Sequence, residues 1–408
     1  MKILITTDWY EPVINGVVTS VRNLKREMEK RGHEVRVLTL SDSGRARKEK
    51  DVYFIPSVSL KQIYPGARGS LPFFGNSFVK ELIRWRPDVV HSQCEFMTFC
   101  HAVRISRACG CPLVHTCHTS YGDYVHYLPK GIRNDWNEEK IVASFLRVVL
   151  KKVDVLVVSS KKVEKILNSY GITEKISVVP SGISLHRFSG QLTQEEKIQR
   201  RSALGFPKDR KILVSIGRLA KEKNLEEILV WFARLIKEGE KSIGLLIGGD
   251  GPDRQELEQM TDMLGIREQV RFTGMISPEK VGEIYQLGHV FVCASTSETQ
   301  GMTYMEAMAS RVPVLCRRDL CLDGVVLDGW NGFQYDSYEQ FKLHVKYLLE
   351  NETRRQEMGQ AGWETAQVFS DRNFGISIEK VYEEAFVYAD QYDVQGRYRE
   401  RARSSVCS

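Results

Sequence analysis

The chain has 408 residues, 42% of them hydrophobic and 27% charged, which is enough for two domains because single hydrophobic cores stop growing near ~250–300 residues. No apolar run approaches the ~20 residues that a membrane-spanning helix needs, so we expect no segment to cross a bilayer. The formal net charge of +6 indicates an anionic ligand or membrane surface as partner more than nucleic acid, for which the sequence carries no motif.

The amino-terminal segment does not fit a signal peptide. It is a short apolar strand that ends at Asp8, Glu11 and Pro12, without a longer apolar region or a small-residue cleavage site. We therefore expect the protein to be cytoplasmic. The nine cysteines are odd in number and lack paired zinc spacing, so we interpret them as reduced core thiols and predict no metal site.

Short β-branched segments alternate with segments of helical period, a pattern typical of parallel sheets with helices on both faces. The first series of predicted strands comprises Lys2–Thr7, Glu34–Leu40, Val52–Ile55, Val89–Ser92, Pro112–Thr116, Val153–Ser159 and Ile176–Pro180. After a polar stretch from Ser184 to Arg210, the second series comprises Lys211–Gly217, Ser242–Gly248, Val270–Thr273, His289–Ala294 and Val312–Cys316.

The two series predict two doubly wound, Rossmann-like α/β domains. We place the boundary near Arg187, which gives an amino-terminal domain of residues 1–187 and a carboxy-terminal domain of residues 188–375. Residues 376–390 carry apolar side chains at helical spacing. We therefore expect a helix within 376–408 that crosses back and packs on the first domain.

In open parallel sheets, ligands bind at the carboxyl ends of strands, so the loops that follow strands are candidate sites. Asn15-Gly16 comes after the first strand, where glycine lets a ligand approach the backbone, although such a pair is more often only a turn. Arg218 and Lys223 come after Lys211–Gly217. Two cations beside a helix start suit a diphosphate, and the alternative is a solvated basic loop.

The strongest signal follows the fourth strand of the second series. Gly301 can free the backbone N–H groups of Met302 and Thr303 to face phosphate oxygens at a helix start. A helix rises roughly 7 Å between Gly301 and Glu306, about the distance from a diphosphate to a ribose. One carboxylate can then meet ribose hydroxyls, and the other, Glu298 on the preceding loop, can meet sugar hydroxyls. Paired glutamates alone would more often be a solvated helix face, and the strand, glycine and helix together favour a ligand site.

Residues 115–127 contain three histidines and three tyrosines, a polar and aromatic surface that suits a sugar. His115, within the predicted strand, is more simply a core histidine, whereas His118 just beyond the strand is the better ligand. The HxxH spacing lacks the glutamate of a metalloprotease helix, which argues against zinc. The other polar residues of this loop are candidates for the acceptor side of a site: Tyr121, Asp123, Tyr124 and His126.

Together these motifs resemble the family 4 retaining glycosyltransferases of the GT-B fold, over nearly the whole chain. They occur in that family's order: Asn15-Gly16, the His118 loop, residues 178–183, 217–223, 248–252 and 272–274, and the pair Glu298 and Glu306. Residues 118–127 and 297–303 look like the bacterial glucosyltransferases that glucosylate diacylglycerol. Gly122 and Ser181 stand where those enzymes usually carry Glu and Asn.

The resemblance implies that Arg218 and Lys223 hold the donor diphosphate, that Glu306 binds the ribose, and that Glu298 holds the transferred sugar. The implied reaction moves a hexose, most simply glucose from UDP-glucose, to a lipid such as 1,2-diacylglycerol with retention. It requires no cofactor, because the cations and helix dipoles neutralise the leaving diphosphate.

Three further residues receive roles from the resemblance. His118 would hydrogen-bond the 6-hydroxyl of the sugar, Gly16 would let the backbone approach the phosphates, and Gly274 would lie near the base. Two alternatives stay open: a transferase that uses a phosphoinositide or a polyprenyl-linked glycan as acceptor, and a non-catalytic nucleotide-sugar-binding protein. A dehydrogenase is disfavoured, because neither opening strand is followed by a Gly-x-Gly-x-x-Gly turn.

A lipid acceptor would bring the protein to the inner face of the cell membrane, and we expect peripheral, reversible docking on an anionic surface. Residues 64–74, 78–86 and 141–152 motivate this expectation, because basic side chains in them accompany aromatic and aliphatic ones. The alternative for residues 78–86 is the core stripe of an ordinary covering helix.

Overall fold

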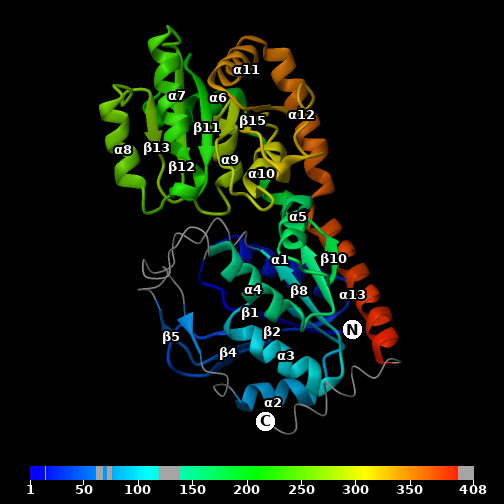
Figure 1. Ribbon diagram of the computed structural model, residues 1–408. Helices are drawn as coiled ribbons and strands as arrows, with labels where there is room; N and C mark the ends of the chain where they lie inside the picture. The colour runs from blue at the N-terminus through cyan, green and yellow to red at the C-terminus, as the bar shows by residue number, and fades with distance from the viewer. Residues whose placement is uncertain (14, 61–67, 71–75, 119–137, 394–408) are drawn as a thin grey trace. The chain divides into compact units, whose positions relative to one another are not determined.

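The computed structural model describes residues 1–13, 15–60, 68–70, 76–118 and 138–393. The chain forms two compact units (Figure 1). Unit 1 comprises Met1–Gly182 with Asp371–Ser408, and unit 2 comprises Ile183–Ser370. The divisions therefore fall after Gly182 and Ser370 instead of near Arg187 and residue 375.

Residues 183–188 join unit 2 because they pack on it. Ile183 forms a parallel bridge with Ser370. The short 3₁₀-helix η2 (Leu185–Phe188) buries Phe188, whose ring lies 6.4 Å from that of Tyr285 between centroids. The first residues of the polar stretch from Ser184 to Arg210 therefore form a helix of unit 2.

Unit 1 contains an eight-stranded sheet in the order β10-β9-β8-β7-β1-β2-β4-β3. Its strands are β1 (Lys2–Thr7), β2 (Glu34–Leu40), β3 (Arg47–Glu49), β4 (Val52–Ile55), β7 (Val89–Ser92), β8 (Leu113–Cys117), β9 (Val155–Val158) and β10 (Lys175–Val178). Neighbouring strands are parallel except β3 and β4. A separate antiparallel pair joins β5 (Val58–Ser59) and β6 (Arg68–Gly69).

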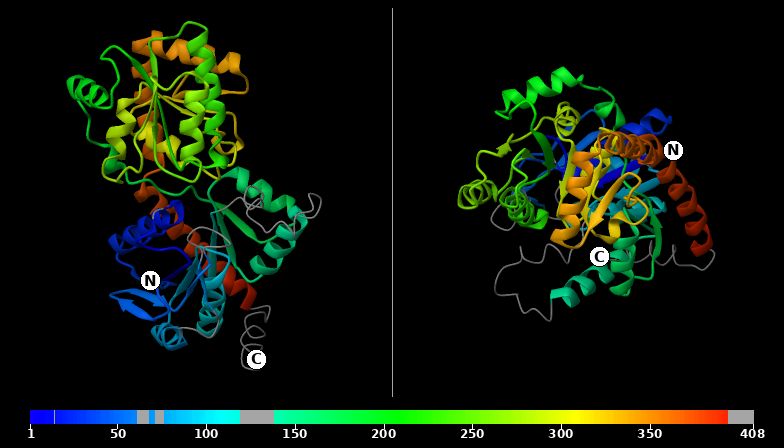
Figure 2. Two further views of the ribbon diagram at one scale, coloured as in Figure 1. Left: turned by 90° about the vertical axis from the view of Figure 1, so that its left-hand side faces the viewer. Right: turned by 90° about the horizontal axis from the view of Figure 1, so that it is seen from above.

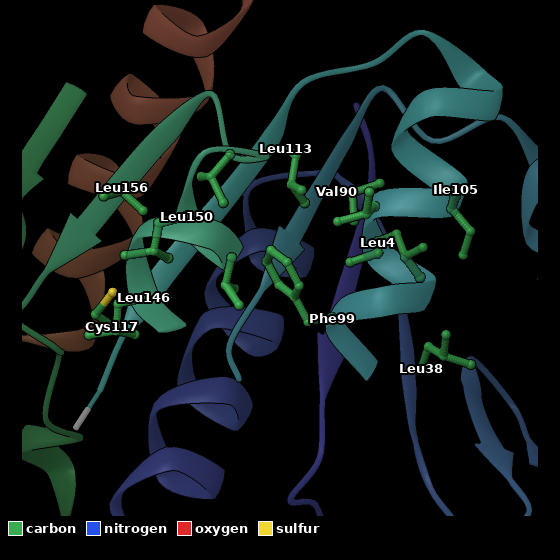
Figure 3. Close-up of a cluster of buried hydrophobic side chains, with 14 of the residues drawn as sticks. Leu4, Leu38, Val90, Phe99, Ile105, Leu113, Cys117, Leu146, Leu150 and Leu156 are labelled. Carbon is green, nitrogen blue, oxygen red and sulfur yellow. The ribbon is translucent and has the colours of Figure 1, made fainter. Parts of the chain in front are cut away.

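Six helices cover this sheet: α1 (Gly16–Lys30), α2 (Asn76–Trp85), α3 (Met97–Cys109), α4 (Glu138–Leu150), α5 (Lys161–Ser169) and α13 (Asp371–Asp393). Successive strand residues point to opposite faces, so the central strands contribute to two cores. Leu4 packs in a cluster with residues of α2 to α5, whereas Ile3 and Ile5 pack with α1 and α13. Figure 3 shows the first cluster, with Phe99 of α3 and Leu146 of α4 against the strands.

Helix α13 returns the chain to unit 1 after unit 2 is complete (Figures 1 and 2). It begins at Asp371, before the periodic segment that the sequence displays from residue 376. Its buried stripe includes Ile378 and Tyr382, which pack on the sheet. The Tyr382 hydroxyl lies 2.8 Å from Nδ1 of His91 in β7, so a buried polar contact adds to the apolar packing.

Helix α2 buries most of the apolar residues that suggested a docking surface in residues 78–86. Val79 and Leu82 are fully buried, Trp85 is nearly so, and Ile83 packs against the same core. The apolar residues of α2 therefore form a core stripe, because the helix covers the sheet with that face. Phe73 and Phe74, in the neighbouring segment, lie outside the described residues.

Unit 2 contains a six-stranded parallel sheet in the order β13-β12-β11-β14-β15-β16. Its strands are β11 (Lys211–Ile216), β12 (Ile243–Gly248), β13 (Val270–Phe272), β14 (Val290–Cys293), β15 (Val314–Arg317) and β16 (Gly332–Tyr335). Besides η2, its helices are α6 (Gln194–Ala203), η3 (Lys221–Lys223), α7 (Leu225–Lys237), α8 (Arg254–Met263), α9 (Val281–Leu287), α10 (Met302–Ala309), η4 (Leu320–Leu322), α11 (Tyr338–Glu350) and α12 (Glu352–Val368).

Helices cover both faces of this sheet as well (Figure 2). Leu213 packs with α7, α8 and α11, whereas Val214, the next residue, packs with α9 and α10. Two doubly wound α/β units, as the strand pattern predicted, are thus present. The strands β3, β5, β6 and β16 were not predicted.

Two expectations from the sequence concern membrane-spanning segments and the cysteine thiols. Among the described helices, none is both long and apolar enough to cross a membrane. Within the described residues no cysteine forms a disulfide, and most cysteines are buried, but Cys100 is exposed and so is not a core thiol.

Candidate functional site

The carboxyl ends of β11 and β14, neighbours in the sheet of unit 2, carry two loops that meet. Lys223, at the end of η3, places Nζ 2.5 Å from Oε1 of Glu298 in the loop after β14. Both side chains are half-buried, with 26% and 12% of their surfaces exposed. The structure therefore pairs the cation assigned to the diphosphate with the carboxylate assigned to the sugar.

Backbone contacts hold the same two loops together. The hydroxyls of Ser295 and Ser297 both donate to the backbone carbonyl of Glu222, at 3.1 and 2.9 Å. Asn224, the residue before α7, donates from Nδ2 to the carbonyl of Ala294 at 3.4 Å. These hydrogen bonds join the loop that carries Lys223 to the loop that carries Glu298. The two serines were visible in the sequence motif, but their spacing did not indicate this role.

Arg218 begins the loop after β11 and is partly exposed. Its guanidinium Nη1 lies 4.0 Å from Oε1 of Glu222, whose side chain is 5% exposed. Arg218 and Lys223 thus come from one short segment, and the planar fork of Arg218 is suited to two phosphate oxygens.

Helix α10 begins at the glycine that the sequence singled out. Gly301 is its N-cap residue with φ of +74°, and a Cβ there would lie 2.2 Å from the ring of Tyr304. Only glycine adopts this conformation without strain and without that clash. Met302 and Thr303, both half-buried, form the first turn of α10, where the helix dipole favours an anion.

Glu306 lies on α10 one turn beyond these residues and is half-buried. Its Oε2 accepts a hydrogen bond of 2.9 Å from the hydroxyl of Tyr285 in α9. The side chain of Tyr285 is fully buried, and the sequence analysis did not single it out. Burial raises the pKa of Glu306 to about 7, against the opposing effects of the Tyr285 hydroxyl and of Arg187. The carboxylate therefore lies between its two protonation states near neutral pH.

Gly274 follows β13 and also has a positive φ, of +72°. Its carbonyl accepts a hydrogen bond of 3.0 Å from the N–H of Gly249, which follows β12. A Cβ on Gly274 would lie 3.1 Å from Nη1 of Arg254 at the start of α8. The loops after β12 and β13 are thus joined through main-chain groups.

In unit 1, Gly16 is the first residue of α1. Asn15 is the N-cap, and its Oδ1 accepts a hydrogen bond of 2.8 Å from the N–H of Val18. A Cβ built on Gly16 would meet no atom of the described residues within 4 Å. The Asn-Gly pair is therefore a helix start with open space beside its glycine, a geometry that admits a ligand near the backbone.

His118 lies directly after β8, and its Nε2 is 2.7 Å from Oε1 of Gln93, which follows β7. Gln93 is 2% exposed, and burial lowers the pKa of His118 to about 4. The imidazole is therefore neutral near pH 7. Because Gln93 Oε1 can only accept, the hydrogen of the neutral ring lies on Nε2, and Nδ1 carries the lone pair. Gln93 was not singled out from the sequence.

His115 is fully buried in β8, and its Nε2 lies 3.0 Å from Oε1 of Glu95. Within the described residues, one group of side chains is close enough to hold a metal ion: Glu95, His115 and Cys117, with ligand atoms within 4.8 Å of one another. Burial raises the pKa of the Cys117 thiol well above its usual value.

The remaining candidates for the acceptor side fall in residues 119–137, outside the described part of the chain. They are Tyr121, Asp123, Tyr124 and His126.

Family comparisons divide the chain at nearly the same place as its two units. The family described as "Glycosyltransferase Family 4" matches residues 14–187, and "Glycosyl transferases group 1" matches residues 196–365.

Curated relatives match most of the chain. The alpha-monoglucosyldiacylglycerol synthase of Streptococcus pneumoniae is 34% identical over 391 residues, which cover 95% of this chain and 86% of the relative. A protein with the same name from Acholeplasma laidlawii is 32% identical over 356 residues, or 86% of this chain and 89% of the relative.

Solved structures share the fold. Anabaena HepE in complex with UDP and glucose superposes with a TM-score of 0.70 at 16% identity, covering 94% of this chain and 100% of that one. Sucrose-phosphate synthase from Thermosynechococcus elongatus gives a TM-score of 0.72 at 17% identity, covering 95% and 99%. With both family matches and relatives above 30% identity over most of its length, the chain belongs to the family 4 glycosyltransferases, enzymes of the GT-B fold.

Proposed function

We propose that this glycosyltransferase transfers glucose from UDP-glucose to 1,2-diacylglycerol with retention of configuration, giving an α-glucosyl diacylglycerol. The acceptor is proposed because the two relatives described above carry the name alpha-monoglucosyldiacylglycerol synthase. The donor is proposed because the site in unit 2 combines features that suit a nucleoside diphosphate and a hexose.

One observation carries the donor part of this proposal: the contact of Lys223 with Glu298 between the loops after β11 and β14. It brings a diphosphate-binding cation and a carboxylate that can accept sugar hydroxyls to one place. Gly301 at the start of α10 adds a helix N-terminus, and Glu306 adds a second carboxylate for the ribose. A nucleotide sugar has the same sequence of groups: ribose, diphosphate and hexose.

The proposed mechanism is a front-face substitution. The bond from the sugar C1 to the β-phosphate oxygen breaks while a bond from C1 to the acceptor oxygen forms on the same face, and the departing phosphate oxygen takes the acceptor proton. Arg218 and Lys223 stabilise the negative charge that develops on the diphosphate. Neither Glu298 nor Glu306 acts as a nucleophile, so no covalent intermediate forms.

His118 in unit 1 is proposed to accept a hydrogen bond from the 6-hydroxyl of the sugar through Nδ1. The contact with Gln93 supports this role, because it orients the ring and takes up the N–H of Nε2. Nδ1 is then the nitrogen that can accept a hydrogen bond. A neutral imidazole is the acceptor that a hydroxyl needs, and the pKa of about 4 keeps the ring neutral near pH 7.

Helix α4 supports docking of unit 1 on an anionic membrane. Its inner face buries Leu146 and Leu150, yet Ile141, Phe145 and Val148 on the opposite side are 45%, 40% and 64% exposed. These three form an apolar stripe, because residues three and four apart share a helix face.

Aromatic and basic neighbours extend this stripe. Phe96, 49% exposed, stacks on Phe145 with ring centroids 6.1 Å apart. Arg147, Lys151 and Lys152 are exposed on or directly after α4. Basic groups each contribute about 1 kcal/mol near an anionic surface, and the apolar stripe adds burial in the interface. The acceptor, a lipid, would be reached at this surface.

The experiment that tests the proposal is an incubation of purified protein with UDP-glucose or GDP-mannose and extracted lipids, with products analysed by mass spectrometry. We expect a monohexosyl diacylglycerol from UDP-glucose, and we expect EDTA to leave activity largely intact. A glycosylated phosphoinositide or polyprenyl-linked glycan would show that the acceptor is not diacylglycerol. A mannosylated product from GDP-mannose would show that the donor is not UDP-glucose. Absence of any transfer would favour a non-catalytic binding protein.

A further inference from the structure

The best-defined contact of Glu306 is with a residue that no motif singled out. Tyr285 of α9 donates from its hydroxyl to Oε2 of Glu306 at 2.9 Å. The Tyr285 side chain is fully buried, and its ring contacts those of Phe188 and Phe291, with centroids 6.4 and 5.6 Å away. Packing on two sides fixes the ring, so the hydroxyl remains directed at Glu306.

The carboxylate itself has limited freedom. Among the described residues, the ionisable groups that act on Glu306 are Tyr285 from α9 and Arg187 from η2. Helix α12 and strand β15 also pack on α10, and neither adds a charged group that moves the pKa of Glu306. With Oε2 held by Tyr285, the position of Oε1 follows from the planar geometry of the carboxylate.

We propose that Tyr285 is a positioning residue for donor binding, whose hydroxyl holds Oε2 of Glu306 so that the carboxylate presents Oε1 to the ribose hydroxyls of a uridine nucleotide. This inference rests on the proposed function, in which Glu306 binds the ribose. It adds a residue from another helix, which never touches the donor and acts through the carboxylate.

The proposal has a consequence for the pH dependence of nucleotide binding. Ribose hydroxyls donate hydrogen bonds to a carboxylate, whereas a carboxylic acid is a weaker acceptor. Affinity for the nucleotide should therefore fall as pH falls through the pKa of Glu306, which is about 7. The Tyr285 hydroxyl lowers that pKa. Its removal raises the pKa, so the loss of affinity should begin at higher pH.

Calorimetric titration with UDP and with 2′,3′-dideoxy-UDP tests the proposal on the full-length protein. Wild type should prefer UDP, and Tyr285→Phe should weaken UDP binding near pH 7 by roughly five- to tenfold while binding of the dideoxy nucleotide changes little. Tyr335→Phe is the matched control, because Tyr335 is also fully buried and donates to a backbone carbonyl, that of Cys293. The control should bind both nucleotides as wild type does.

Glu306→Gln supplies a second variant in case Tyr285→Phe is unstable. It keeps an oxygen for the Tyr285 hydroxyl but does not ionise, so its preference for UDP over 2′,3′-dideoxy-UDP should not vary with pH, whereas the preference of wild type should fall through the pKa of Glu306. Comparing the two nucleotides cancels the titration of the terminal phosphate that they share. The proposal is overturned if Tyr285→Phe matches Tyr335→Phe at every pH with both nucleotides, or if the preference of Glu306→Gln for UDP over 2′,3′-dideoxy-UDP changes with pH as that of wild type does. A wild-type protein that neither binds UDP nor transfers glucose would instead overturn the proposed function.

Discussion

Lys223 Nζ lies 2.5 Å from Glu298 Oε1, although 75 residues separate the two positions in the chain. Both side chains are partly buried, so loss of either leaves the other partly desolvated without this partner. In the proposed reaction, Lys223 also binds the donor diphosphate and Glu298 binds its sugar. The ion pair therefore links the two halves of the donor site before a donor arrives.

A double-mutant cycle measures this link. Lys223→Ala and Glu298→Ala should each lower kcat/KM for the donor by roughly 10- to 100-fold, since each removes a hydrogen bond to a charged group. The double variant should lose less than the product of the two effects, because both single variants break the same pair. The pair of Lys346 and Glu240, 2.9 Å apart on the surface of unit 2, is the control and should show little effect. Strictly multiplicative losses at Lys223 and Glu298 would contradict the link.

Arg218→Ala and Glu306→Gln should affect different steps. Arg218 faces charge that grows on the diphosphate as the glycosidic bond breaks, so its loss should lower kcat by roughly 100-fold with a smaller change in UDP affinity. Glu306→Gln should mainly weaken donor binding, because ribose contacts exist before and during the reaction. Steady-state kinetics with calorimetric UDP binding separates the two; near-wild-type turnover by Arg218→Ala would refute the assignment of Arg218.

Gln93→Glu should shift the acid side of the pH–rate profile upward. In wild type, burial keeps the pKa of His118 at about 4, so protonation of the ring does not reduce activity near neutral pH. A carboxylate beside Nε2 stabilises the imidazolium and raises this pKa by roughly 1–3 units. The charged ring loses its acceptor nitrogen, and turnover should fall at correspondingly higher pH.

NMR titration of His118 in the same variant checks the cause. Gln93→Met, which removes the amide without adding charge, is the comparison and should lower turnover without the upward shift. An unchanged His118 titration in Gln93→Glu would mean that Gln93 does not control the protonation of the ring.

Membrane docking should depend on the exposed stripe of α4. In liposome sedimentation, binding of wild type should rise with phosphatidylglycerol content and fall with salt, because screening weakens the attraction of Arg147, Lys151 and Lys152. A variant with serine in place of Ile141, Phe145 and Val148 should bind several-fold less, since it loses the apolar burial.

The matched control places serine at three exposed apolar positions of unit 2: Val230, Leu343 and Leu320. It should bind vesicles as wild type does. Equal loss in both triple variants, or equal wild-type binding to neutral and anionic vesicles, would exclude α4 as the docking surface.

The central strands of both sheets could be predicted from the sequence. They are buried on both faces, and their sequences are therefore short runs rich in β-branched residues. β16 was missed, since Gly332-Phe-Gln-Tyr335 contains one glycine and one glutamine and has no such run. Helix α2 shows the limit of a local pattern: Val79 and Leu82 could face either a membrane or a core, and only the sheet beneath them decides.

The site residues from motifs were predictable, but their partners were not. Gln93 and Tyr285 contact His118 and Glu306 across gaps of 25 and 21 residues, and nothing in the spacing of the sequence specifies such contacts. They follow from the order of strands and from helix packing. The roles assigned to the site residues stay predictions until a nucleotide complex is measured. They are those of Gly16, His118, Arg218, Lys223, Gly274, Glu298, Gly301, Met302, Thr303 and Glu306.

Transfer of labelled glucose from UDP-glucose to 1,2-diacylglycerol, with the anomeric configuration of the product determined by NMR, tests the central claim most directly. We predict an α-linked monoglucosyl diacylglycerol, formed by wild type and reduced roughly 10- to 100-fold by Glu298→Ala. A β-linked product would contradict retention. Absence of any glucosylated diacylglycerol in anionic mixed micelles, from protein that binds UDP, would contradict the proposed acceptor.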